Sequence, residues 1–158
     1  MSEAAAPFDR APGLTPLLSL DVQHSPAVVI DETAVVGRRY IPIIGGSFWG
    51  ELEGRVLPGG GDWQSVWPDR AEVSAHYILE TAAGGRIEVQ SNGLRHGPAE
   101  VIARLGRGEA VDPGEYYFRT ALRFATGAPA LAHLNRLLAV GVGARGPNDV
   151  QLQVFRVL

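Results

Sequence analysis

Residues 73–90, VSAHYILETAAGGRIEVQ, decide the fold class. Apolar side chains occupy every second position on both sides of a glycine pair: Val73, Ala75, Tyr77 and Leu79 before it, and Ile87 and Val89 after it. Alternation with a period of two is typical of a strand that buries one face. A Gly-Gly pair between two such runs is typical of a tight hairpin turn. The stretch therefore predicts an antiparallel β-hairpin.

The same alternation continues outward along the chain in both directions. Further runs with a period of two lie at 18–22, 27–30, 40–44, 48–56, 115–124 and 150–158. Turn residues separate the runs about every 8–12 positions, a spacing typical of all-β sandwiches and barrels. Gly45-Gly46 is expected to end the run at 40–44. The final run is expected to pair near the first and close the sheet, which removes exposed edges.

Two segments depart from this alternation. Pro129 and the run 130–139 predict an amphipathic helix, because proline is favoured in a first helical turn. Its apolar stripe comprises Leu131, Leu134, Leu138 and Leu137, and Gly141 is expected to stop it. Residues 95–114 show little periodicity and are predicted as a loop, with a short turn or strand at 100–104.

The predicted fold is all-β: a closed antiparallel β-barrel of about eight or nine strands, with one C-terminal amphipathic helix packed against it. Residues 1–13 are rich in alanine and proline and are expected to form a flexible N-terminal arm. Residues 14–158 then form a single barrel domain, long enough to close one core.

Composition argues against several classes of function. The chain of 158 residues has a formal net charge of -3 and scattered basic residues, so neither nucleic acid nor an anionic membrane is expected as a partner. It has no cysteine, which excludes thiolate catalysis and cysteine-based zinc sites. Neither a secretory signal nor an apolar run of membrane-spanning length is visible, so a cytoplasmic location is expected.

Motifs for metal binding, nucleophilic catalysis and phosphate binding are missing from the sequence. The four histidines show no i,i+4 pair. Ser47 lacks the strand-to-helix elbow of a hydrolase serine. The Gly59-Gly60-Gly61 run lacks the lysine and helix of a phosphate-binding loop. No metal and no cofactor are expected.

Asp62 and Trp63 follow the glycine turn and are the first candidates for a site. The Asp62 carboxylate could transfer a proton, and the Trp63 ring offers a flat face to an aromatic ligand. An Asx turn, with Trp63 closing the end of the barrel, explains the pair equally well.

The run 115–124 has two different faces. Tyr117 and Arg119 share one of them. If this stripe faces the interior, Arg119 must be paired or must meet an anionic or carbonyl group; if it faces out, it is solvated. The other face is mainly apolar and comprises Tyr116, Phe118, Thr120, Leu122 and Phe124. A homodimer is expected if that apolar face lies outside the barrel without cover from the helix.

Asn135 lies on or near the apolar stripe of the predicted helix. A buried amide there needs hydrogen-bond partners. Two interpretations remain open, a structural cap on the sheet and a contact with a ligand.

Several short motifs occur in a fixed order along the chain. They are Gly37-Arg38, Gly45-Gly46-x-x-x-Gly50, Gly54-x-Val56-x-Pro58-Gly59-Gly60-x-Asp62-Trp63, Asn92-Gly93-x-Arg95, Tyr117-x-Arg119 and Leu134-Asn135. Taken together, across residues 14–158, they resemble the signature of the family catalogued as domain of unknown function thirty-two thirty-seven. One departure is Gly84-Gly85, where that family usually has an Asp-Gly turn.

The resemblance implies a small β-barrel similar to those of allene oxide cyclase and dirigent proteins, which bind hydrophobic small molecules and steer their cyclisation or coupling. It also implies enzymes of secondary or aromatic metabolism, including decarboxylation or rearrangement of phenolic compounds. The polar residues that match the motifs become site candidates, and Tyr40 joins them because it shares a strand face with Arg38. The candidates are Arg38, Tyr40, Asp62, Trp63, Tyr117, Arg119 and Asn135.

Three hypotheses about function follow. The first is a cofactor-independent lyase (a decarboxylase) or isomerase (a cyclase) acting on a small aromatic or polyketide-like molecule. Arg38 or Arg119 would hold a carboxylate or oxyanion, Asp62 or Tyr117 would move a proton, and Trp63 would stack on the ring. The second is a non-catalytic barrel that binds a small hydrophobic or aromatic ligand, which can be acidic. The third is a barrel filled by side chains, which acts through assembly.

Overall fold

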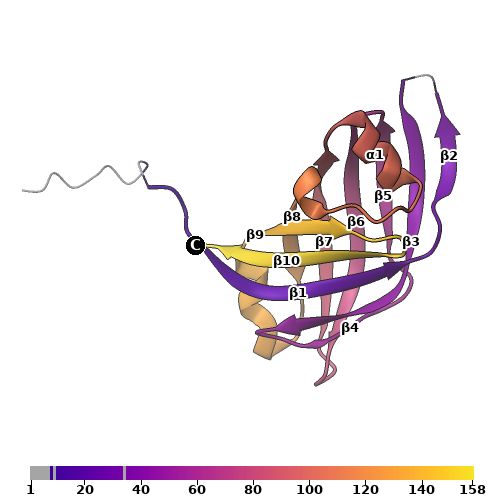
Figure 1. Cartoon of the computed structure of the whole chain (residues 1–158). Helices are drawn as coiled ribbons and strands as arrows, with labels where there is room; N and C mark the ends of the chain where they lie inside the picture. Colours follow the sequence, from indigo (N-terminus) through magenta and orange to yellow (C-terminus); the bar gives the residue numbers. More distant parts are fainter. Residues whose placement is uncertain (1–7, 9, 34) are drawn as a thin grey trace, which may run out of the picture.

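The computed structural model describes residues 8, 10–33 and 35–158, so most of the predicted arm at 1–13 lies outside the described residues. The rest forms a ten-stranded antiparallel sheet (Figure 1). The elements in chain order are β1 (Leu14–His24), β2 (Val28–Glu32), β3 (Gly37–Gly50), β4 (Gly54–Val56), β5 (Gly61–Trp67), β6 (Arg70–Thr81), β7 (Arg86–His96), α1 (Ala99–Gly106), η1 (Pro113–Glu115), β8 (Tyr117–Ala125), η2 (Pro129–Arg136), β9 (Ala139–Arg145) and β10 (Asp149–Val157).

The sheet closes into a barrel because β1 pairs with β10 on one side and with β3 on the other. β4 and β5 pair with different parts of β3 and β6, so these two short strands share one position in the wall. The result is a closed eight-stranded barrel with two extra strands, as predicted. The expected pairing of the last strand with the first is confirmed.

The hairpin at 73–90 is present and longer than its sequence signal. β6 and β7 pair continuously from Arg70 opposite His96 to Glu80 opposite Arg86. Tyr77, Leu79, Ile87 and Val89 are buried on its inner face. The residues between them point outward, because neighbouring side chains on a strand lie on opposite faces.

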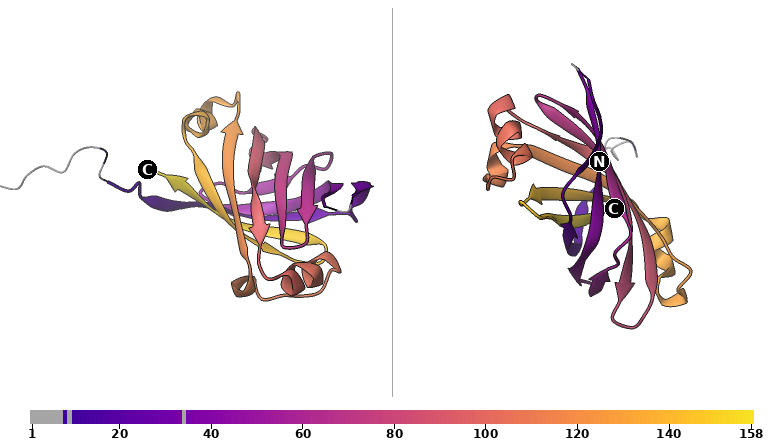
Figure 2. Two further views of the ribbon diagram at one scale, coloured as in Figure 1. Left: turned by 90° about the horizontal axis from the view of Figure 1, so that it is seen from above. Right: turned by 90° about the vertical axis from the view of Figure 1, so that its right-hand side faces the viewer.

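The helical segments lie at opposite ends of the barrel (Figure 2). α1 covers one end with Val101, Ile102 and Leu105, which share one helix face. It occupies the segment that was predicted as a loop. At the other end, η2 is the predicted C-terminal helix, formed as a 3-10 helix with Leu131 and Leu134 buried.

The segment after η2 differs from the prediction. Leu138, which was expected on the apolar stripe of the helix, is exposed. β9 begins at Ala139 and runs through Gly141, the expected helix stop. The pairing of β9 with β8 and β10 explains why these residues are extended rather than helical.

β3 contains a β-bulge where the sequence predicted the end of a strand. Gln23 pairs with Gly45, but His24 pairs with Ile43, so the register with β1 shifts by one residue. The shift changes which positions face inward, from odd (Ile43) to even (Phe48). Glycine is required at position 46, because a Cβ there would lie 2.0 Å from the carbonyl oxygen of Asp21.

The barrel interior has two parts, which we name after their side chains. The apolar half, toward η2, is filled by aliphatic and aromatic side chains that are almost fully buried: Leu18, Leu20, Phe48, Val56, Leu79, Ile87, Val89, Leu122, Leu134 and Val154. The polar half, toward α1, contains the inward polar residues of the same sheet: His24, Asp62, Gln64, Tyr77, Ser91, Arg95, Thr120 and Arg145. This half contains the cavity described below.

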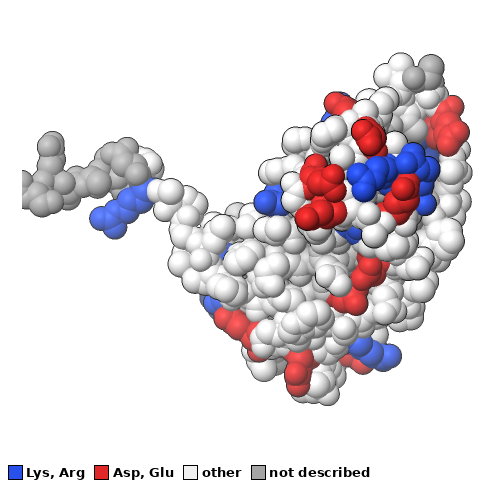
Figure 3. Space-filling model, viewed as in Figure 1, with Lys and Arg blue, Asp and Glu red and all other residues white. Residues whose placement is uncertain are grey.

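The outer surface differs from one face to another. In the view of Figure 3, charged side chains gather over α1, whereas the surface over β1, β9 and β10 carries little charge. Tyr116, Phe118 and the rest of the mainly apolar face of β8 are buried inside the barrel, so the condition on which a homodimer was expected is not met. Within the described residues, no helix has the length and apolarity needed to cross a bilayer.

Candidate functional site

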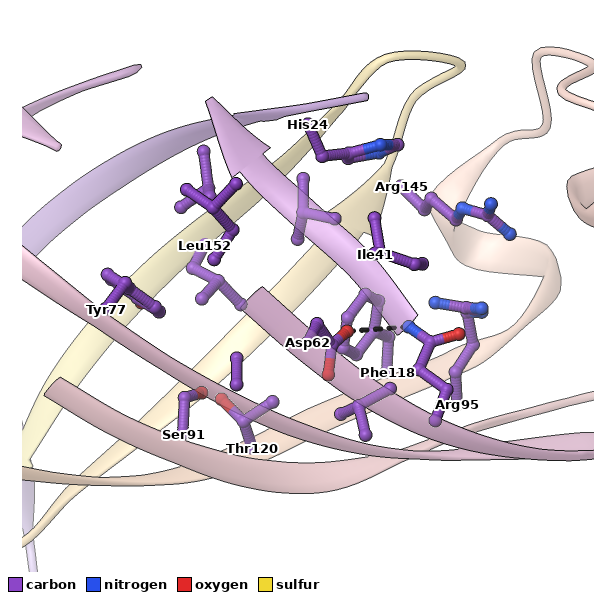
Figure 4. Close-up of a pocket in the computed structure, with 16 residues that line it drawn as sticks. His24, Ile41, Asp62, Tyr77, Ser91, Arg95, Phe118, Thr120, Arg145 and Leu152 are labelled. Carbon is purple, nitrogen blue, oxygen red and sulfur yellow. Dashed lines mark hydrogen bonds between the residues drawn. The ribbon is translucent and has the colours of Figure 1, made fainter. Parts of the chain in front are cut away.

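A cavity lies inside the polar half of the barrel (Figure 4). It offers a volume of about 50 Å³ to the centres of water-sized molecules. A water molecule needs roughly 10–15 Å³ on this measure, and an engineered cavity of about 150 Å³ accepts benzene. The cavity in this conformation therefore fits a carboxylate-sized group or a few water molecules, and an aromatic ring requires movement of its lining.

Asp62 reaches the cavity from β5, the short strand between β3 and β6. Its neighbours alternate around it: Gln64 is buried and lines the cavity, whereas Trp63 is 51% exposed on the outside. The strand alternation of β5 thus explains why Asp62 and Trp63, adjacent in sequence, lie on opposite sides of the wall.

Both carboxylate oxygens of Asp62 accept hydrogen bonds. The Gln64 side-chain amide donates to Oδ2 at 2.6 Å, and the backbone N–H of Ser74 donates to Oδ1 at 2.9 Å. Burial nevertheless raises the pKa of Asp62, because desolvation outweighs these bonds and the nearby charges of Arg95 and Arg39. A carboxyl group with a raised pKa is suited to giving and accepting a proton near neutral pH.

Gln64 links Asp62 to a partly buried arginine. Arg39 Nε donates to Gln64 Oε1 at 2.8 Å, which leaves the Gln64 amide nitrogen to donate to Asp62. Burial lowers the pKa of Arg39, while Asp62 opposes that change. The three side chains form a hydrogen-bonded series from the barrel wall to the cavity.

Arg95 is buried in the polar half with only 2% of its surface exposed. Its Nε has no hydrogen-bond partner among the described residues, and its guanidinium lies 5.2 Å from the centre of the Phe118 ring. Burial, followed by the charges of Arg145 and Arg39, lowers the pKa of Arg95 to about 9. The side chain still carries its positive charge at neutral pH.

Arg145 lies at the end of β9, and its side chain faces the same cavity as that of Arg95 (Figure 4). Its backbone N–H donates to the Tyr116 hydroxyl at 2.9 Å, which ties the strand end to the barrel. Nη1 is buried without a hydrogen-bond partner in the described chain. Burial, followed by the charge of Arg39, lowers the pKa of Arg145 to about 10.

These arginines have no close ion-pair partner. Within the described part of the chain, no carboxylate oxygen lies within 4.0 Å of the Arg39, Arg95 or Arg145 guanidinium. Asp62 is the carboxylate that interacts electrostatically with all three. The polar half therefore holds an excess of positive charge.

Three further groups at the cavity also have buried atoms without a partner among the described residues: the Tyr77 hydroxyl, Thr120 Oγ1 and His24 Nε2. Burial raises the pKa of Tyr77, so its hydroxyl keeps its proton and can donate. His24 Nδ1 lies 3.0 Å from the carbonyl oxygen of Ser25, which can only accept, so Nδ1 carries the hydrogen. In the neutral ring Nε2 then offers a lone pair toward the cavity. Buried polar groups normally have partners, so these atoms indicate a site for a ligand or ordered water.

The structure separates the residues that the sequence put forward as catalytic. Asp62 lines the cavity. Tyr117 and Arg119 lie on the outer face of β8, and Tyr117 is 44% exposed. Arg119 packs over the Tyr117 ring, which stacks on His96. These two residues cannot reach a molecule held beside Asp62, because the barrel wall lies between.

The predicted ligand-binding residues also lie outside the cavity. Arg38 is exposed and donates to the Ser65 hydroxyl at 3.0 Å. Tyr40 packs against Trp63 on the outer wall, with ring centres 4.6 Å apart. Asn135 is exposed rather than on the buried stripe of η2, and it bonds both the N–H and the carbonyl of Thr126. Its role is to fix η2 to the end of β8.

Sequence reasoning missed Arg39, Arg95 and Arg145. The alternation of Ile87 and Val89 extends through Ser91 to Arg95, so the parity of β7 was a usable signal. Arg39 shares its parity with Ile41 and Ile43, which lie on the same side of the bulge in β3, so the parity of that part of the strand was a usable signal too. Arg145 belongs to β9, whose strand pattern is weak because glycines occupy positions 141 and 143. In the described chain, no cluster of three His, Cys, Asp or Glu side chains is placed to hold a metal ion.

Comparison with known proteins shows the family to which this chain belongs. The family model described as Protein of unknown function (DUF3237) matches residues 12–157. The chain belongs to this family. The DUF3237 match confirms the resemblance inferred from the ordered glycine, Asp-Trp and Tyr-x-Arg motifs.

Individual relatives of this DUF3237 protein are similar in sequence or in fold. A UPF0311 protein from Bradyrhizobium diazoefficiens is 41% identical over 132 residues, which are 83% of this chain and 87% of that protein. The crystal structure of a conserved protein of unknown function from Rhodopseudomonas palustris matches with a TM-score of 0.88 and 36% identity, covering 94% of this chain and 99% of that one. An enzyme from Penicillium herquei matches with a TM-score of 0.71 and 20% identity, over 93% and 95% of the two chains, a likeness in fold alone.

Proposed function

We propose that this protein is a cofactor-independent lyase or isomerase that acts on one small aromatic or polyketide-like molecule in the interior cavity. The observation that supports this most is Asp62: a carboxyl group with a raised pKa, fixed by two hydrogen bonds, at the wall of a cavity with unpaired polar atoms. Titratable groups perturbed in this way cluster at functional sites. The fold neighbour from Penicillium herquei is described as an enzyme, which supports catalysis by analogy of fold.

The proposed chemistry is proton transfer at a carbon next to a carbonyl group. The ionised Asp62 carboxylate takes the proton, the C–H electron pair forms a carbon–carbon double bond, and the π pair of the carbonyl group moves onto its oxygen to give an enolate. Asp62 then returns the proton to a different carbon in an isomerase. In a lyase, the electron pair expels a leaving group, and Asp62 gives its proton to that group. Both sequences regenerate the carboxylate.

Tyr77 and Thr120 are placed to stabilise the oxygen on which charge develops. Both hydroxyl groups line the same cavity as Asp62 and have no partner among the described residues. Donors fixed before the reaction stabilise a developing oxyanion, and loss of one donor costs about 100-fold to 1000-fold in rate. The buried hydroxyl of Tyr77 stays protonated and so remains a donor at neutral pH.

A ligand larger than the present cavity needs access through the polar end. α1 covers this end by packing Val101, Ile102 and Leu105 against Val73 and Phe118, two residues that line the cavity. We propose that the segment carrying α1 moves to admit an aromatic ring. Amide hydrogen exchange that is faster in α1 than in β6 and β7 would support this motion.

The experiment is proton exchange in D₂O. We would incubate the protein with enolisable aryl ketones and phenolic β-keto acids and follow loss of the C–H signal and product formation by NMR. Asp62→Asn is expected to slow exchange about 100-fold to 10,000-fold, the usual contribution of a general base. Arg119→Gln, on the outer wall, is the matched control and should keep the original rate. An unchanged rate in Asp62→Asn would refute the proposed role of Asp62.

A non-catalytic binding barrel is the second candidate, and one observation favours it. Both oxygens of Asp62 already accept hydrogen bonds from the protein, as the oxygens of a structural carboxylate do. Binding of panel compounds by calorimetry, without exchange or product in the NMR experiment, would establish this candidate in place of the enzyme.

A further inference from the structure

Arg95 and Arg145 line the cavity and are not among the site candidates that the sequence put forward. We infer that their guanidinium groups form the binding site for the carboxylate of an organic acid, placed under α1 beside Asp62. This inference deepens the proposed function and rests on it for the premise that a ligand enters the cavity.

Both arginines have buried guanidinium nitrogens without a partner among the described residues. Arg95 is 2% exposed, and both Arg95 Nε and Arg145 Nη1 are buried without a hydrogen-bond partner in the described residues. Removing a charge from water is costly unless it is paired and hydrogen-bonded. Two such positively charged groups facing one cavity favour an anionic ligand between them.

The charges around the cavity are not balanced. Arg39 and Asp62 are joined through Gln64, so Asp62 is already engaged by an arginine on its own side of the cavity. Arg95 and Arg145 repel each other and Arg39, and each guanidinium lacks a carboxylate within 4.0 Å in the described chain. One negative charge between Arg95 and Arg145 would relieve this repulsion.

The polarity of the cavity lining selects the kind of anion. A planar guanidinium fork matches carboxylate and phosphate alike. The available volume of about 50 Å³ admits either group, so the lining and the charge of the cavity decide between them. The rest of the lining is largely apolar, with Val22, Ile41, Ile43, Phe118 and Leu152, and Asp62 opposes a second negative charge. The ligand class is therefore a monocarboxylate with an apolar body.

A carboxylate subsite at Arg95 and Arg145 fits the proposed chemistry at Asp62. Figure 4 places Arg95 and Arg145 on one side of Asp62, and Tyr77 on the opposite side. A carboxylate bound by the arginines directs the remainder of the molecule past Asp62 toward the hydroxyl groups of Tyr77 and Thr120. The expected substrates are acids whose reacting carbonyl lies a few bonds from the carboxylate.

The test compares acids with their uncharged amides at constant ionic strength. Acetate, isobutyrate and benzoate are paired with acetamide, isobutyramide and benzamide, and binding is measured by calorimetry and thermal shift. Each acid is expected to bind the wild-type protein at least about tenfold more tightly than its amide, since hydrogen bonds to charged groups are the stronger ones. Arg95→Gln and Arg145→Gln should each lose about tenfold or more in acid affinity and little in amide affinity. Arg119→Gln should match the wild type.

Three results would overturn the inference: equal binding of acids and amides, an unchanged acid preference in both arginine variants, or tighter binding of inorganic phosphate than of any acid. If Arg95→Gln does not fold, Arg95→Lys replaces it and should keep part of the preference, because its charge remains.

Asp62→Asn separates this inference from the proposed enzyme. The variant removes a negative charge beside the arginines, so acids are expected to bind it at least as tightly as the wild type, whereas proton exchange is lost. Acid binding without exchange in the wild type would leave the carboxylate site standing and refute the enzyme. Proton exchange that depends on Asp62 but is equally fast in acids and in neutral ketones would support the enzyme and refute the carboxylate site.

Discussion

The apolar and polar halves of the interior are built from the same strands but have opposite effects on stability. On β7, Ile87 and Val89 face the apolar half, and Ser91 and Arg95 continue the same row into the polar half. In the apolar half, each fully buried aliphatic or aromatic side chain contributes about 1.5–3 kcal/mol. In the polar half, an unpaired guanidinium costs free energy.

This difference teaches where function can lie in a small barrel. Inward-facing positions alternate along the whole length of each strand. The same fold can therefore carry either apolar or polar side chains at these positions. The apolar half provides the stability that allows the polar half to keep unpaired charges. Strained or destabilised sites of this kind are typical of functional regions.

The largest expected effect is on the apolar half. Phe48 is 2% exposed in the core, and Phe48→Ala should lower the free energy of unfolding by about 3–5 kcal/mol. Thr120→Val is its counterpart in the polar half. It replaces a buried hydroxyl without a partner in the described chain, and should leave stability unchanged or raise it by about 1 kcal/mol. Urea unfolding monitored by circular dichroism measures both, and equal losses would contradict the division into halves.

Arg95→Met tests whether the polar half is costly. Methionine keeps much of the volume and removes a buried charge, so the free energy of unfolding should rise by about 1–4 kcal/mol. A variant that is more stable but binds acids less tightly would show that the polar half gives up stability for ligand binding. A loss of more than about 1 kcal/mol would show that Arg95 has a structural partner, and the carboxylate site would then need another explanation.

The pH dependence of stability tests Asp62. Its pKa is raised above the ordinary 3.8, so the folded state holds this proton more tightly than the unfolded state does. This contribution therefore lowers stability as the pH rises from about 4 to the raised pKa, by at most about 1.4 kcal/mol for each pH unit. The difference in unfolding free energy between wild type and Asp62→Asn, measured between pH 4 and pH 8, should show this slope. A pH-independent difference would mean that the pKa is not raised.

The smallest expected effect is on the outer wall. Arg119→Gln removes an exposed guanidinium that packs over Tyr117. It should change the free energy of unfolding by no more than about 0.5 kcal/mol. Thermal unfolding of Arg119→Gln and of Arg95→Met, measured side by side, compares an outer with an inner arginine of the same wall.

Much of the fold follows from the sequence because strand alternation is a local property. β6, β7, β8 and β10 each carry a period of two that is visible without any partner strand. β9 does not, since Gly141 and Gly143 leave few side chains to alternate. α1 is a single short helix without a side-chain cap, and its stability comes from packing on the end of the barrel.

The candidate site was harder to predict because it depends on which face of each strand is inside. Asp62 was identified from its motif. Arg38 lies on the outer face of β3 beside the inward Arg39, and Tyr117 lies on the outer face of β8 beside the buried Phe118. A difference of one position along a strand places a side chain on the opposite face of the barrel wall. Asn135 was placed by helical spacing, which a 3-10 helix does not follow.

The bulge at Gly45-Gly46 has a practical consequence for protein engineering. Substitutions meant to change the cavity lining must follow a different parity on each side of the bulge in β3. Odd positions such as Ile41 and Ile43 face inward before the bulge, and even positions such as Phe48 face inward after it. A library that varies every second codon through the whole strand would randomise the outer surface over half of its length. Position 46 should stay outside any such library, because a side chain there would collide with the backbone of Asp21.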